Sequence, residues 1–242
     1  AGAVIEGFVI SQAGSPTAGY VLNQTAGQVN DCVFSGTTNT STYTALSVSG
    51  GRMQRCVVRN LSFSTGNGAT RKMCNLTGAT VVADGCVFTN NIDNTIYGAS
   101  SATVVMEKGA TLRNSLVAGN TYANGDQSGV HASSKAGTFL AIENCTIANN
   151  AAKRGSAAGA GIYDGSGYTL VVNTIVEGNT VPTSANGANV KAGVAVPALN
   201  SICPELSEAD GCMQDSAKFV NAAAGDYRLA ADSPAIDAGY AW

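Results

Sequence analysis

Residues that could carry chemistry are few in this chain of 242 residues. His131 is its single histidine, and the 16 acidic residues are scattered singly, without a DxD or DD pair. General acid–base catalysis and calcium binding both need carboxylates that lie close together. The sequence therefore indicates no catalytic residue, no set of metal ligands and no cofactor.

Three charged residues nevertheless recur at a regular spacing. Asp84, Arg113 and Glu143 are separated by 29 and 30 residues, in the order acid, base, acid. If this spacing equals one structural repeat, the three side chains lie next to one another. A polysaccharide lyase could use such a base with flanking acids, but we expect a salt-bridge stack on the wall of the molecule.

Three ring-bearing residues form a second candidate set. Tyr97, His131 and Tyr163 each follow an aliphatic residue that is expected to point inward, so the rings are expected to point outward together. Stacked rings with polar tips suit the faces and hydroxyls of sugars, and they predict a glycan-binding strip. The alternative interpretation is ordinary packing of these rings beneath the long loops.

An internal repeat of about thirty residues sets the spacing of both candidate sets. Its core is a short apolar pattern, seen as NDCVFSG at 30–36, DGCVFTNN at 84–91 and ENCTIANN at 143–150. Eight aligned positions are separated by 24, 24, 30, 29, 30, 29 and 27 residues; they are Phe8, Cys32, Cys56, Cys86, Ser115, Cys145, Thr174 and Ser201. Two further apolar runs precede the core in each unit, and Gly, Asn and Ser separate the runs.

This repeat predicts an all-β fold, a single-stranded parallel β-helix (β-solenoid) of about eight coils with three short strands per coil. No segment shows sustained helical periodicity, so each strand must pair with its counterpart in the next coil. Alternation along the core strand places Cys145 and Ile147 inside, and the same offset places Cys86 with Phe88.

Asparagine recurs in the turn that follows each core strand. Stacked amides on successive coils can bond to one another, which predicts a structural asparagine ladder. We assign five residues to it: Asn60, Asn91, Asn120, Asn150 and Asn179.

The chain is predicted to be one β-helix domain, 1–242, with coils over 1–202 and a C-terminal end over 213–242. Cys203 and Cys212 flank a polar insertion, CPELSEADGC, which a disulfide could close in an oxidising compartment. The other five of the seven cysteines are expected to be buried thiols or, where they stack, to form a bridge.

The last residues are expected to close the solenoid. Phe219, Tyr227, Leu229 and Ile236 supply the apolar side chains of the C-terminal stretch. We expect them to cover the open end of the last coil.

Two passages resemble a known family. NCTIANN and GAGIYDGSGYTLVVNTIVEGN are similar to right-handed parallel β-helix repeats of secreted bacterial proteins. The ending FVNAAAGDYRLAADSPAIDAG, at 219–239, resembles the end of β-helix domains in bacterial surface proteins of the choice-of-anchor Q type. This resemblance implies export to a bacterial surface or the medium, but no single activity, because related coils occur in adhesins, tailspikes and polysaccharide lyases.

Composition narrows the possible partners. Only 12% of residues are charged and the net charge is −3, which disfavours nucleic acid. No apolar run is long enough for a membrane span. The basic pairs at 71–72 and 153–154 are expected to be solvated loop charges that an acidic glycan could meet. The first coil begins almost at residue 1, so we expect further coils of a longer chain, or a partner chain, at that end.

The sequence thus favours a non-catalytic secreted or cell-surface module for adhesion or glycan binding, with a polysaccharide or a host-surface glycan as its partner. A β-helix polysaccharide lyase or glycoside hydrolase is the first alternative. A structural stalk or assembly subunit is the second.

Overall fold

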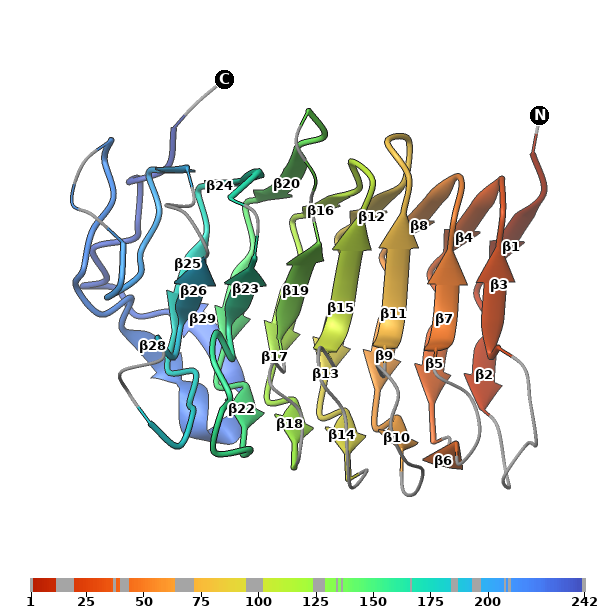
Figure 1. The fold of residues 1–242 in the computed structure, drawn as a ribbon, viewed down its shortest axis with the longest axis horizontal. Helices are drawn as coiled ribbons and strands as arrows, with labels where there is room; N and C mark the ends of the chain where they lie inside the picture. Colours follow the sequence, from red (N-terminus) through yellow and green to blue (C-terminus); the bar gives the residue numbers. More distant parts are fainter. Residues whose placement is uncertain are drawn as a thin grey trace.

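The computed structural model describes residues 2–11, 20–36, 38–39, 44–63, 72–94, 102–123, 129–133, 135, 137–165, 167–183, 187–192, 197–206, 208 and 210–240. Within these residues the chain is a parallel β-solenoid with almost no helix. Its strands lie side by side along the long axis, from the N-terminal end to the C-terminal end (Figure 1). The predicted fold class is confirmed at this level.

Three sheets form the walls. Sheet A contains β1 (Val4–Glu6), β4 (Gln28–Asn30), β8 (Arg52–Gln54), β12 (Val82–Asp84), β16 (Thr111–Arg113), β20 (Leu140–Glu143), β24 (Thr169–Val172) and β27 (Ala198–Leu199). Sheet B contains β2 (Val9–Ser11), β5 (Val33–Ser35), β9 (Val57–Arg59), β13 (Val87–Thr89), β17 (Leu116–Ala118), β21 (Thr146–Ala148) and β25 (Ile175–Glu177). Sheet C contains β3 (Leu22–Gln24), β7 (Thr44–Val48), β11 (Lys72–Thr77), β15 (Ala102–Glu107), β19 (Val130–Ser133), β23 (Ile162–Asp164) and β26 (Val190–Ala192).

A fourth, narrow sheet was not predicted. Sheet D contains the two-residue strands β6 (Thr38–Asn39), β10 (Ser62–Phe63), β14 (Ile92–Asp93), β18 (Thr121–Tyr122) and β22 (Ala151–Ala152). The chain visits sheets C, A, B and D in turn, and each strand pairs in parallel with its counterpart in the next coil. Across the described residues, sheets A, B, C and D hold eight, seven, seven and five strands. The coil number of about eight and the right-handed sense of the solenoid remain predictions.

The core follows the predicted alternation along sheet B. Phe34, Val58, Phe88, Val117 and Ile147 stack in register and are completely buried. Cys86 and Cys145 share their interior face, as predicted. The residue before each aligned position turns the chain from sheet A into sheet B with positive φ, for example Asn114 at 50° and Asn144 at 52°. Asparagine tolerates this left-handed conformation better than most residues do.

The asparagine ladder is confirmed, with one correction. Asn91, Asn120, Asn150 and Asn179 are buried, and each side-chain amide donates to the side-chain oxygen of the next asparagine at 2.8–3.0 Å. The ladder ends on Asn189, which the sequence did not indicate.

Asn60 does not belong to the ladder. Leu61 occupies that position, and its backbone N–H donates to Oδ1 of Asn91 at 3.1 Å. Asn60 lies one residue earlier, in the left-handed turn at φ 55°. The sequence hides this offset because two later coils carry asparagine at both positions, as in Asn149-Asn150.

The C-terminal stretch does not cover the last coil as predicted. β28 (Phe219–Asn221), the 3₁₀ turn η2 (Ala222–Ala224) and β29 (Asp226–Leu229) form a hairpin. Asn149 on the wall donates its side-chain amide to the carbonyl of Ala222 at 3.2 Å, so the hairpin lies along the flank. Ile236 is 45% exposed rather than covering core.

The insertion 203–212 takes over part of that covering role. Leu206 packs into the core cluster. Ile202 pairs with Ile175 on one side and with Met213 on the other, so the chain after the insertion forms the next layer. The Glu205 carboxylate accepts the backbone N–H groups of Ala188 and Asn189, which fixes the end of the ladder.

Replacing a ladder residue tests how much these amides contribute. The Asn150 side chain makes four buried hydrogen bonds, to Asn120, Val117 and Asn179. Asn150→Ala leaves their partners unsatisfied, so we expect the free energy of unfolding to fall by about 3 to 5 kcal/mol. Chemical denaturation measures this. Asn23→Ala, on an exposed strand position, is the matched control and should change stability by under about 0.5 kcal/mol.

Candidate functional site

The outer face of sheet C gathers the polar residues best placed for binding. The strand register aligns one outward row across five coils, which consists of Asn75, Val105, His131, Tyr163 and Lys191. The rings of His131 and Tyr163 meet edge to face, with centroids 5.3 Å apart. Two members of the predicted ring set are therefore neighbours on this face.

The register of sheet C places no third ring beside His131 in the preceding coil. Val105 of β15 is the residue beside His131 in the preceding coil. Tyr97 itself lies in 95–101, outside the described residues. The sequence misled here because β15 carries a continuous apolar run, ATVVME, without the aromatic mark used to align the coils.

A second row on the same face carries an ion pair. Thr77, Glu107 and Ser133 are aligned by the strand register. Lys72 Nζ lies 2.9 Å from Oε1 of Glu107, and the Thr77 hydroxyl donates to Oε2 at 2.9 Å. Partial burial opposes ionisation of Glu107, but the hydrogen bond and charge of Lys72 prevail and lower its pKa. Lys72 is therefore a strand residue in an ion pair, not the solvated loop charge that was predicted.

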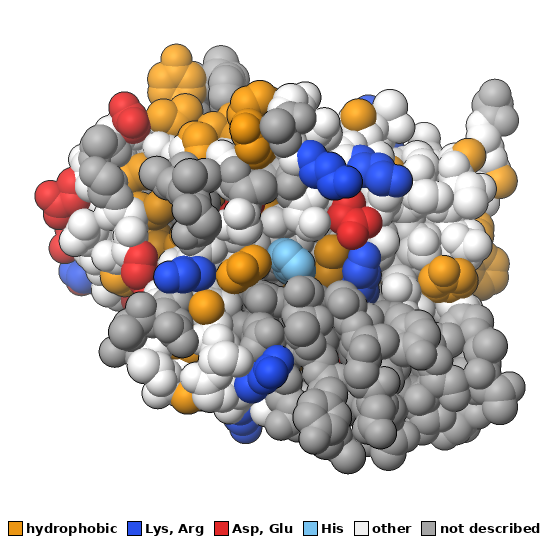
Figure 2. Space-filling view, viewed as in Figure 1, with side chains coloured by type: hydrophobic (Ala, Val, Ile, Leu, Met, Phe, Trp, Pro, Cys, Tyr) orange, Lys and Arg blue, Asp and Glu red, His pale blue; other side chains and the backbone are white. Residues whose placement is uncertain are grey.

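A hollow of about 430 Å³ opens beside this ion pair. Its lining consists of Ala79, Glu107, Lys108, Ser133, Lys135 and Thr138. Figure 2 shows basic and acidic side chains gathered on this side of the molecule, next to the single histidine. The hollow thus brings ammonium groups and hydroxyls together beside the ring pair.

A second ring pair lies near the hollow and was missed. Phe139 follows Thr138 in the chain, is 63% exposed, and meets Tyr168 edge to face with centroids 5.7 Å apart. The only signal in the sequence was an aromatic residue at the start of two successive GxxL runs, GTFLAIEN and GYTLVVN. That signal is weak because such positions often pack against neighbouring strands.

The predicted salt-bridge stack exists in part, on sheet A. The register aligns Asp84, Arg113 and Glu143 as expected. Arg113 pairs with Asp84 at 2.8 Å, and Asn114 donates to the other oxygen of Asp84 at 2.8 Å. Despite desolvation, these bonds lower the pKa of Asp84. Among the described residues no ion pair reaches Glu143, so the stack has two bonded members rather than three.

The hollow beneath the C-terminal hairpin is a weaker candidate. It measures about 420 Å³ and lies between the wall at Asn114 and Asn144 and the hairpin residues Tyr227 and Arg228. Arg228 is held by the carboxylate of Asp226 at 2.6 Å, which compensates its charge. The lining is otherwise neutral and offers little chemistry.

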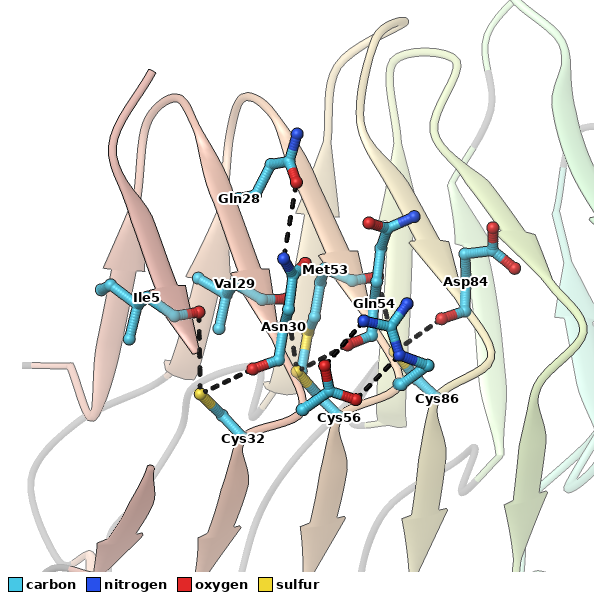
Figure 3. Close-up of polar contacts among 12 residues, drawn as sticks. Ile5, Gln28, Val29, Asn30, Cys32, Met53, Gln54, Cys56, Asp84 and Cys86 are labelled. Atoms are coloured by element: carbon cyan, nitrogen blue, oxygen red, sulfur yellow. Dashed lines mark hydrogen bonds and ion pairs between the residues drawn. The ribbon is translucent and has the colours of Figure 1, made fainter. Parts of the chain in front are cut away.

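Buried thiols form a row inside the solenoid and hydrogen-bond to its backbone (Figure 3). Cys32, Cys56 and Cys86 each donate to the carbonyl two residues earlier, at 3.2, 3.3 and 3.5 Å. Burial raises the pKa of Cys145, further along the row, to about 12. Within the described residues no group of three or more His, Cys, Asp or Glu could hold a metal ion.

The predicted disulfide between Cys203 and Cys212 is not present. Both are free and buried, and the Cys203 thiol lies 3.3 Å from Oε2 of Glu205. Backbone hydrogen bonds close the insertion instead, from Cys203 to Met213 and from Met213 to Ser201. A covalent link is therefore not needed to hold its ends together.

Comparison with known proteins finds no matching family model, no matching curated protein and no matching solved structure. No helix in the described part of the chain is long and apolar enough to cross a membrane.

The ion pair on sheet C predicts a specific acid response. Because the pKa of Glu107 is lowered in the folded state, its stabilisation is present above its unfolded value of 4.5 and is lost as the pH falls through the folded value. Glu107→Gln should cost about 1 kcal/mol at pH 7 and almost nothing at pH 2. Thermal unfolding from pH 2 to 7 measures this, with the exposed Glu208→Gln as control.

Thiol counting tests the free cysteines. Denatured protein, kept without reductant, should react with seven equivalents of a thiol reagent, and a count of five would indicate one disulfide. The native protein should react slowly, because all seven thiols are buried and burial raises the pKa of Cys74, Cys145 and Cys203.

Proposed function

We propose that this protein is a non-catalytic secreted or cell-surface module that binds glycans on the outer face of sheet C. The observation that carries the proposal is the His131–Tyr163 ring pair on this face. The same outward row also holds the polar Asn75 and Lys191 and the buried Val105. Rings with polar tips offer an apolar face to sugar C–H groups and a hydrogen-bonding edge to hydroxyls.

The finer family assignment belongs to the same proposal. The C-terminal resemblance to choice-of-anchor Q proteins and the repeat phrases support a right-handed β-helix of a bacterial surface protein. The solenoid fold is compatible with this assignment. It favours no activity by itself, because such folds carry unrelated functions.

A lyase is the second candidate because one observation favours it. Lys72 and Glu107 place a base and a carboxylate together at the rim of a hollow. The Lys72 ammonium group is already bound to the Glu107 carboxylate at 2.9 Å, however, so neither group is free to act on a substrate. We therefore rank binding above catalysis.

An assembly subunit is the third candidate, supported by the first coil. Val4, Phe8 and Val9 are 55%, 59% and 71% exposed beside the strand edges of β1 and β2. Exposed apolar side chains at a strand edge favour contact with another protein surface.

Glycan retention tests the proposal. Purified protein is applied to a glycan array in calcium and again in EDTA, and absorbance at 235 nm reports unsaturated products. We expect retention without new absorbance. Tyr163→Ala and His131→Ala should each weaken binding by about fivefold, or about 1 kcal/mol.

Tyr20→Ala is the matched control, because Tyr20 is 54% exposed and lies just before β3, four strands from β19 along sheet C. It should bind like the parent protein. New absorbance at 235 nm would favour the lyase over the binding proposal. Glycan retention that is unchanged in both Tyr163→Ala and His131→Ala would show that sheet C is not the binding site.

A further inference from the structure

We propose that the hollow between Lys108 and Lys135 is a subsite for the anionic group, carboxylate or sulfate, of an acidic polysaccharide. This inference rests on the proposed glycan binding and adds the class of ligand. The hollow lies next to the ring pair in the same coils, because Ser133 and Lys135 follow His131 along the chain.

The charges around the hollow do not cancel. Both oxygens of Glu107 are occupied, one by Lys72 and one by Thr77. Among the described residues no carboxylate pairs with Lys108 or Lys135, and both are exposed. Once the Lys72–Glu107 pair is set aside, two positive charges remain at one place on a chain whose net charge is −3.

Neighbouring coils bring these groups together. Lys108 lies in the turn after β15, and Lys135 lies in the loop after β19, one coil further on. The turn that contains Lys108 and Gly109 packs closely against the neighbouring coils on both sides. A Cβ added to Gly109 would lie 3.1 Å from Ala79 in the preceding coil and 3.5 Å from Thr138 in the following coil. Three successive coils therefore contribute to one hollow, and the Ser133 and Thr138 side chains add hydroxyls to its lining.

Ring pairs are present on both sides of the charged hollow along the chain. Residues 131 to 139 begin with the His131–Tyr163 pair and end with the Phe139–Tyr168 pair, with Lys135 between them. An acidic polysaccharide has the matching chemistry, since its sugar rings carry both apolar faces and regularly placed anions. A neutral glycan would leave the two ammonium groups without counterparts.

The experiment compares ligands and variants in one titration series. Polygalacturonate supplies carboxylates, dextran sulfate supplies sulfates, and dextran is neutral. Lys108→Asn removes the charge, and asparagine is chosen because it tolerates the local φ of 55°. Combined with Lys135→Gln, it should weaken binding of at least one anionic ligand by about tenfold, and the parent affinity should fall as NaCl rises.

The matched control is Lys153→Gln with Lys218→Gln, which removes two exposed charges elsewhere. It should bind like the parent protein, and circular dichroism should confirm that all variants are folded. Polygalacturonate against dextran sulfate identifies carboxylate or sulfate as the preferred group.

The two proposals fail differently. One outcome would overturn the subsite and retain the glycan function. In that outcome dextran and the anionic ligands bind equally well, Tyr163→Ala loses binding, and the Lys108/Lys135 variant binds like the parent protein. Equal losses in the two lysine double variants would also overturn the subsite. Absence of binding to all three polymers would overturn both. Tighter binding of single-stranded DNA than of either anionic polysaccharide would reassign the surface.

Discussion

Hydrogen bonding between successive coils is the constraint on which the rest of this structure depends. Each described strand of sheets A to D pairs in parallel with its counterpart one coil away, and the buried asparagine row from Asn91 to Asn189 repeats that bond with side chains. A buried amide that lost its partner would cost the desolvation of both groups. The coils are therefore held in one register, and a slip by one residue would exchange the inner and outer faces.

Fixed register explains how a chain poor in charge can build a local surface. Outward residues of neighbouring coils lie at strand spacing, about 4.8 Å apart, without long side chains having to reach. His131 and Tyr163 meet in this way, and so do Thr77 and Glu107 near them. Variable turns then add Lys108, Lys135 and Phe139 around the same face. The hydrogen-bonded sheets hold the coils in place, and the turns between strands carry further charged and aromatic side chains.

Spacing alone could predict much of the fold. The aligned interior positions, the asparagine ladder and the alignment of Asp84 with Arg113 all follow from a repeat whose period is nearly constant. These positions are strongly constrained, because a coil interior accepts small or apolar residues, or polar residues whose hydrogen bonds are satisfied as in the ladder. The fourth sheet was missed because strands of two residues leave no periodic pattern.

The errors have a different physical origin. Tyr97 was aligned with His131 because the segment between sheets B and C varies in length, and no hydrogen-bonded position marks it in the sequence. Asn60 was misplaced by one residue because two adjacent positions both favour asparagine, one for φ and one for the ladder. The cysteines at 203 and 212 flank a loop that backbone pairing already closes. The Phe139–Tyr168 pair depends on contacts across coils that a single strand does not reveal.

Hydrogen exchange in the presence of polygalacturonate tests the central claim, that the face built by β15, β19 and β23 is the binding surface. The account predicts added protection in peptides covering 102–109, 129–141 and 162–170, with no change in the hairpin 219–229. Protection confined to that hairpin, or to the first coil at 4–11, would contradict it.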